Sequence, residues 1–173
     1  GLFARRLPLS FNASITFEQN YGGVEGDSAT LAEALAVLSD LADLPLRQDL
    51  AVTGSANQRG EVQAIGGLVR KVEGFYQTCI EAGDLTGTQG VVFPAANEAN
   101  LILRGEIVEA IAGERFHLWS VRHIDEAIEL FTGVPAGVAD KSGNYPPDTV
   151  YGRIATQLIA FDQALDSRDR RGE

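Results

Sequence analysis

The chain has 173 residues, 45% of them hydrophobic, so it can bury one substantial core without disulfides or metals to hold it together. Its formal net charge of −10 argues against nucleic-acid partners and anionic membrane surfaces, which require basic patches on the protein. The single cysteine, Cys79, excludes an internal disulfide and favours a reducing cytoplasm, and no apolar run approaches the length of a membrane span.

The first predicted elements are a strand over residues 9–17 and a helix that starts at Ser28. A glycine-punctuated loop, Tyr21–Gly26, precedes the helix, and Leu44-Pro45 ends it. Apolar residues recur between these limits at the spacing of one helical face. They are Leu31, Leu35, Leu38 and Ala42.

Two interpretations of the helix start remain open. Asp27 and Ser28 are both favoured N-cap residues, so their presence needs no catalytic explanation. Alternatively, the Ser28 hydroxyl is a nucleophile, and the backbone N–H groups of Ser28 and Ala29 stabilise an oxyanion at the positive end of the helix.

A β-hairpin is predicted next, from the alternating runs Leu50–Ser55 and Gly60–Ile65. Thr53 is expected on its first strand. A hydroxyl there can orient a nearby amine, although threonine is also simply a good strand residue.

Gly66-Gly67 introduces a helix over Leu68–Ala82, which Gly83 ends. Its apolar stripe is expected to be Leu68, Val72, Phe75, Cys79 and Ala82. Lys71 lies on the shoulder of this stripe, where partial burial would disfavour its charged form and prepare it to act as a general base. The alternative is a lysine whose stem covers apolar surface while its head reaches water.

The remainder alternates between strands and helices. Strands are predicted at Gly90–Pro94 and Phe116–Val121, and helices at Asn97–Ala112 and Ile124–Phe131. This α/β alternation favours a mixed β-sheet with helices packed on it. Residues 1–132 form the domain, residues 133–148 a Pro/Gly linker, and residues 149–173 a C-terminal helix with a frayed tail. One face of that helix carries Tyr151, Ile154, Leu158, Phe161 and Leu165.

Neither histidine predicts a metal site. His117 falls in an alternating strand and His123 precedes a helix, and no second histidine or cysteine stands at zinc-ligand spacing. Both histidines are therefore expected to be structural.

The motifs together resemble those of one protease family. Gly-Gly-Val-Glu-Gly-Asp-Ser-Ala, then Val-Thr-Gly-Ser with Arg-Gly-Glu-Val, then Ile-Gly-Gly with a lysine four residues on, resemble the proteolytic domain of Lon proteases, in the branch with Glu-Gly-Asp-Ser. The resemblance covers about residues 11–132 and implies the α+β fold of the Lon proteolytic domain, a mixed β-sheet with packed helices. It also implies a serine endopeptidase with Ser28 as nucleophile, Lys71 as general base, and Thr53, Glu25 and Asp27 in support.

The resemblance carries expectations beyond the site. It implies unfolded or damaged polypeptides as substrates and a homo-oligomer, a hexameric ring. An amino-terminal part of the usual domain is expected to be missing, as in an excised catalytic domain. No cofactor is expected in these residues, because no P-loop occurs, and ATP and Mg²⁺ would bind an ATPase module outside them.

Two rival hypotheses remain. The first is a catalytically latent or noncatalytic Lon-like assembly domain. The second is a different Ser-Lys hydrolase, against which stands the absence of any Ser-x-x-Lys.

Overall fold

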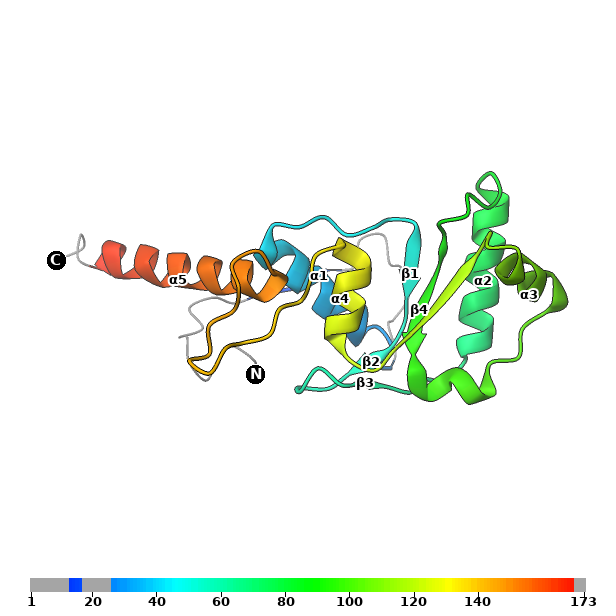
Figure 1. Cartoon of the computed structure of the whole chain (residues 1–173), viewed down its shortest axis with the longest axis horizontal. Helices are drawn as coiled ribbons and strands as arrows, with labels where there is room; N and C mark the ends of the chain where they lie inside the picture. The colour runs from blue at the N-terminus through cyan, green and yellow to red at the C-terminus, as the bar shows by residue number, and fades with distance from the viewer. Residues whose placement is uncertain (1–12, 17–25, 170–173) are drawn as a thin grey trace. The chain divides into compact units, whose positions relative to one another are not determined.

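A computed structural model describes residues 13–16 and 26–169 of the chain (Figure 1). The chain divides into two compact units. One unit, called here the sheet unit, comprises Gly26–Ala34 and Arg47–Ala127. The described residues of the other, the helical unit, are 13–16, 35–46 and 128–169. Helices α1 (Thr30–Ala42) and α4 (Ile124–Thr132) each begin in the sheet unit and end in the helical unit.

A three-stranded parallel sheet organises the sheet unit, in the order β1-β4-β5. Its strands are β1 (Leu50–Val52), β4 (Gly90–Pro94) and β5 (His117–Val121). Every residue of the central strand β4 is buried, as its run of apolar residues between Gly90 and Pro94 predicts. The register sets Ala51 beside Val91, and Val91 beside Leu118.

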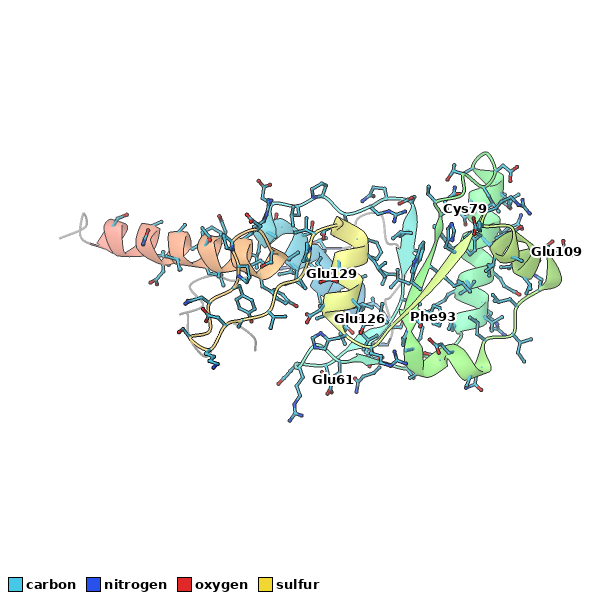
Figure 2. The ribbon with its side chains drawn as sticks, in the orientation of Figure 1. Glu61, Cys79, Phe93, Glu109, Glu126 and Glu129 are labelled. Atoms are coloured by element: carbon cyan, nitrogen blue, oxygen red, sulfur yellow. The ribbon has the colours of Figure 1, made fainter. Side chains whose placement is uncertain are left out.

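Helices α2 (Leu68–Glu81) and α3 (Gly105–Ala112) cover one face of this sheet (Figure 1). Cys79 from α2 and Phe93 from β4 belong to the core between the helices and the strands (Figure 2). Tyr76 meets the ring of Phe116 edge-on, with 5.3 Å between ring centroids. The predicted α+β fold with helices packed on a sheet is therefore confirmed.

The stripe predicted for α2 needs correction at two positions. Tyr76 is buried where Phe75 was expected to be, and Ala82 is exposed beyond the end of the helix. The buried positions are Leu68, Val72, Tyr76 and Cys79, spaced four, four and three apart, so they still share one helical face. Phe75 is thereby turned to a half-buried position at the margin of the core.

The predicted hairpin exists only in part. Its antiparallel ladder joins β2 (Ser55–Ala56) to β3 (Val62–Gln63), whereas β1 pairs in parallel with β4. The strand changes partner at Thr53-Gly54. A Cβ on Gly54 would lie 3.0 Å from the Leu31 side chain, so glycine lets the start of α1 approach the backbone at this point.

The predicted helix over Asn97–Ala112 is wrong in its first half. Ala95–Asn100 is a 3₁₀ helix, η1, the next four residues are extended, and only α3 is α-helical. Leu101 and Leu103 alternate inward against the core while Ile102 is 82% exposed, a pattern that only an extended segment gives.

The helical unit ends in α5 (Val150–Asp169). Residues 133–149 contain no helix or strand, and their backbone is anchored at both ends. Ala136 donates its N–H to Glu129 Oε1 at 2.8 Å, and Val150 donates to Pro135 O at 2.9 Å. Along the predicted apolar face of α5, the exposed fraction rises from 2% at Tyr151 to 43% at Leu165.

The predicted strand over residues 9–17 lies mostly outside the described residues. Residues 13–16 are described and are not part of a strand.

Candidate active site

The site lies within the sheet unit, and its lysine is in the first turn of α2, whose start is held by local contacts. Gly67 is the N-cap residue, at φ 69°, a left-handed conformation that glycine adopts without strain. Just before it, Asn97 accepts the N–H of Ile65 at 3.0 Å and donates to the Ile65 carbonyl at 2.9 Å. These two bonds fix the entry to α2, so they fix the position of Lys71 in its first turn.

The serine is held by a set of bonds between the start of α1 and the chain after β1. Gly54 donates its N–H to the Ser28 carbonyl at 2.9 Å, and Leu31 donates to the Gly54 carbonyl at 3.1 Å. Further along, Ala56 donates to Thr30 Oγ1 at 2.9 Å. The turn containing Ser28 and the start of α1 are thus paired to Gly54 and Ala56 much as a short strand would be.

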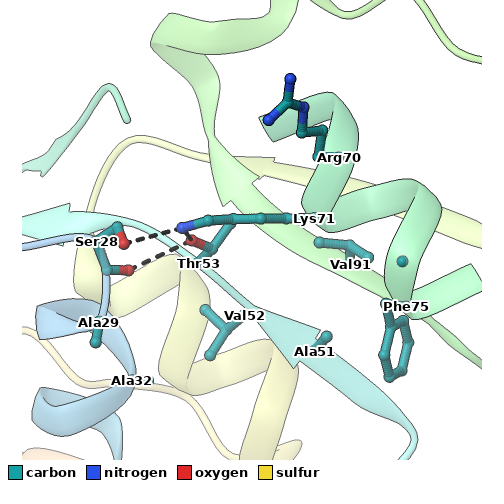
Figure 3. A pocket seen from close by; sticks show the side chains of 11 residues that line it. Ser28, Ala29, Ala32, Ala51, Val52, Thr53, Arg70, Lys71, Phe75 and Val91 are labelled. Carbon is teal, nitrogen blue, oxygen red and sulfur yellow. Dashed lines mark hydrogen bonds between the residues drawn. The ribbon is translucent and has the colours of Figure 1, made fainter. Parts of the chain in front are cut away.

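Lys71 Nζ lies between two hydroxyls (Figure 3). It donates to Ser28 Oγ at 2.9 Å and to Thr53 Oγ1 at 2.9 Å. Thr53 in turn donates to the Ser28 backbone carbonyl at 3.3 Å and is 6% exposed. The fold therefore brings together three side chains from three separate segments at hydrogen-bonding distance.

Three expectations about these residues change. Ser28 precedes α1 by two residues, and its hydroxyl contacts Lys71. Thr53 directly follows β1 and is not part of a strand, although its N–H still donates to Val92 O at 3.1 Å. Lys71 is exposed, contrary to the predicted partial burial, because it faces an open cleft beside the apolar stripe.

The charge pattern of α2 is the reverse of what stabilises a helix. Arg70 and Lys71 stand in its first turn, which contains no acidic residue, and its last turn contains no basic one. Cations are disfavoured at this positive end of the helix dipole. Helix stability therefore does not account for either residue.

The supporting carboxylates are placed differently. Asp27 Oδ2 accepts a hydrogen bond from Ser55 Oγ at 2.7 Å, which ties the residue before Ser28 to β2. Asp27 thus positions the turn and does not contact Lys71. Glu25 lies outside the described residues.

The backbone geometry narrows the choice of oxyanion donors. The N–H of Thr30 donates to Asp27 O at 3.1 Å, and that of Leu31 to Gly54 O, so these amides are occupied. The predicted pair, Ser28 N–H and Ala29 N–H, comes immediately before them. Its role stays a prediction.

A cleft of about 410 Å³ opens beside the serine and lysine (Figure 3). Its lining comes from the start of α1, from β1, from β4 and from α2. The lining residues are Ser28, Ala29, Ala32, Ala51, Val52, Thr53, Arg70, Lys71, Gly74, Phe75 and Val91. A peptide side chain fits a mostly apolar cleft of this size.

Both histidines make backbone contacts away from this cleft. His117 Nε2 is 2.8 Å from Gly87 O, and His123 Nε2 is 2.9 Å from Arg59 O. A carbonyl only accepts, so each Nε2 is the donor. In the part of the chain that the structure describes, no three His, Cys, Asp or Glu side chains gather as metal ligands would.

No described helix has the length and apolar character needed to cross a membrane.

Sequence reasoning did not place Ser55, Asn97 or Arg70 near the site. Ser55 and Asn97 act through hydrogen bonds to segments 28 and 32 residues away, which no local pattern reveals. Arg70, which lines the cleft, had a readable signal, since it is a cation in the first turn of a helix.

Lon proteins of bacteria and archaea are similar to this chain in sequence. A Lon protease homologue of Escherichia coli (strain K12) is 46% identical over 122 residues, covering 70% of this chain and 21% of the relative. A homologue in Haemophilus influenzae is 41% identical and covers 82% of this chain and 23% of the relative. The archaeal Lon protease of Thermococcus kodakarensis is 39% identical and covers 69% and 17%.

The chain thus spans about a fifth of the length of these relatives. The family profile described as the Lon protease (S16) C-terminal proteolytic domain matches residues 20–132, which include Ser28, Thr53 and Lys71. The chain therefore belongs to the family of Lon protease C-terminal proteolytic domains.

Proposed function

We propose that this domain is a serine endopeptidase in which Ser28 is the nucleophile and Lys71 the general base. The observation that carries the proposal is the position of Lys71 Nζ, 2.9 Å from both the Ser28 and the Thr53 hydroxyl oxygens. A nucleophile within hydrogen-bond reach of a base, which a third group orients, is the arrangement that covalent catalysis requires.

The first half of the reaction follows from these contacts. With Lys71 neutral, its Nζ takes the Ser28 proton as Oγ attacks the peptide carbonyl carbon, and the carbonyl electrons move to the oxygen. The N–H groups of Ser28 and Ala29 stabilise this oxyanion. When the C–N bond breaks, the Lys71 ammonium gives its proton to the departing amine, and an acyl-enzyme remains on Ser28.

Water completes the cycle. Lys71 takes a proton from the water as the water oxygen attacks the acyl carbon, and it returns that proton to Ser28 Oγ as the ester bond breaks. Thr53 keeps Nζ directed at Oγ in both halves by accepting one of its hydrogen bonds.

The wider function is inferred from the family. The proposal includes unfolded or damaged polypeptides as substrates, a hexameric ring that encloses the sites, and a cytoplasmic location. ATP and Mg²⁺ would bind an ATPase module outside this chain. Confinement in a ring is reasonable, because an exposed endopeptidase would cleave indiscriminately.

Hydrolysis of casein and of a fluorogenic peptide tests the proposal, with light scattering to report the assembly state. Ser28→Ala and Lys71→Ala are each expected to lower the rate at least about 100-fold. Lys141→Ala is the matched control, because Lys141 is exposed and lies outside the cleft. Equal rates in all variants would contradict the assigned roles. An inactive but fully assembled parent would favour the noncatalytic assembly domain.

A further inference from the structure

Arg70 and Gly74 stand one turn apart on the side of α2 that lines the cleft. Neither residue suits the helix itself. Arg70 is a cation at the positive end of the helix dipole, and a glycine within a helix costs about 0.5–1 kcal/mol relative to alanine. Residues that disagree with their local structure are expected mainly at functional sites.

Among the described residues, none requires glycine at position 74. A Cβ built there meets no atom within 4 Å, so close packing does not explain the missing side chain. The space above Gly74 is instead part of the cleft. A bound peptide can therefore lie close to the helix backbone at this point.

Arg70 itself is exposed, and among the described residues no carboxylate forms an ion pair with it. Glu73, three residues further along α2, instead pairs with Arg104 at 3.4 Å. Other described cations also lack a carboxylate partner, but Arg70 is set apart because it lines the cleft beside Lys71. Guanidinium groups bind carboxylates through two parallel hydrogen bonds.

We propose that Arg70 is a specificity-determining residue that binds a glutamate or aspartate side chain close to the scissile bond of the substrate. The carboxylate pairs with the guanidinium, and the substrate backbone lies in the cleft that Arg70 shares with Ser28 and Lys71. Small side chains on the facing wall, Ala29 and Ala32, leave room for the peptide backbone. This inference rests on the proposed peptidase function and names its preferred substrate.

Arg70 is assigned to recognition and not to proton transfer. Lys71 already occupies the position beside Ser28 Oγ, and residues one apart on a helix do not face each other. If Arg70 acted by making the Lys71 ammonium less favourable, its loss would change the pH profile for every substrate alike. Recognition predicts a change confined to acidic peptides.

The test uses fluorogenic peptides that are identical except for Glu, Gln or Lys, placed in turn at each position flanking the cleaved bond. For the parent chain, kcat/KM for the best Glu peptide is expected to exceed that of its Gln partner about fivefold, as one partly exposed ion pair allows. Arg70→Gln is expected to bring this ratio to about one. Arg70→Glu is expected to favour the Lys peptide. Arg59→Gln, an exposed arginine outside the cleft, serves as the control that keeps the parent ratio.

A binding measurement separates this inference from the peptidase proposal. Fluorescence anisotropy of the same peptides on Ser28→Ala, with and without Arg70→Gln, reports the subsite without turnover. Preferential Glu-peptide binding that disappears with Arg70→Gln supports the inference even if no peptide is cleaved. A Glu:Gln ratio near one in the parent, an equal loss for all peptides, or a shifted pH profile for the Gln peptide overturns it and leaves the dyad untouched.

Discussion

Thr53→Val removes the hydroxyl that links Lys71 to Ser28 while keeping nearly the same side-chain shape. The parent hydroxyl accepts from Lys71 Nζ at 2.9 Å and donates to the Ser28 carbonyl at 3.3 Å. The carbonyl keeps its bond from Gly54 N–H, and the exposed Lys71 can hydrate, so neither partner is left buried without a hydrogen bond. We therefore expect the free energy of unfolding to fall by only about 1 kcal/mol.

The effect on catalysis is expected to be larger. Lysine carries about 2 kcal/mol of rotamer freedom, part of which the Thr53 contact suppresses. If that freedom returns in full, the population with Nζ beside Ser28 Oγ falls about 30-fold. Because the bond to Ser28 remains, we expect kcat/KM for a fluorogenic peptide to fall about 10- to 30-fold.

Thr53→Ser is the matched control, since it keeps the hydroxyl and removes only the methyl group. It is expected to retain activity within about threefold of the parent, whatever stability the missing methyl costs. Urea unfolding of both variants separates a folding defect from a positioning defect. The reasoning is refuted if Thr53→Val stays within twofold of the parent, or if Thr53→Ser loses as much activity as Thr53→Val.

Three further predictions follow from the described contacts. Gly74→Ala adds a methyl group to a helix at an open position, so urea unfolding is expected to show a gain of about 0.5–1 kcal/mol; a lower midpoint would mean that the space is not open. Arg47 holds the pKa of Asp49 at about 2, mainly through a hydrogen bond, against an ordinary value of 3.8. Since the folded pKa is the lower one, this stability is present above about pH 4 and is lost as the pH falls to 2. Both side chains are partly exposed, so Asp49→Asn is expected to cost less than about 1 kcal/mol at pH 6 and only a small part of that at pH 2, whereas a pH-independent difference would count against the pair. A Cβ on Gly90 would overlap the His117 carbonyl oxygen of the neighbouring strand, so Gly90→Ala is expected to lower the free energy of unfolding by about 2 kcal/mol or more; a variant with the parent's thermal midpoint would refute this contact.

Elements that depend on local periodicity were predicted well. The apolar run Gly90–Pro94 is the buried central strand, and the helix predicted at Ile124–Phe131 matches α4. The helix prediction for Asn97–Ala112 was wrong in its first half. There, Leu101 and Leu103 both point toward the core, and packing against the core sets this alternation, not helix propensity. The hairpin prediction was wrong at Gly54, because the N–H and carbonyl of Gly54 bond to Ser28 and Leu31 and not to a partner strand.

The residue types of the site could be read from the sequence, since serine, threonine and lysine occur in the order and motif context of one protease family. Their geometry could not. Ser28 and Lys71 are 43 residues apart, and their contact depends on the bonds from Gly54 to Ser28 and from Asn97 to Ile65. Tertiary packing also leaves Lys71 exposed beside a cleft and places Arg70 in that cleft. Helical periodicity gives the direction of a side chain on its own helix, whereas burial and hydrogen bonding depend on the segments that pack around it.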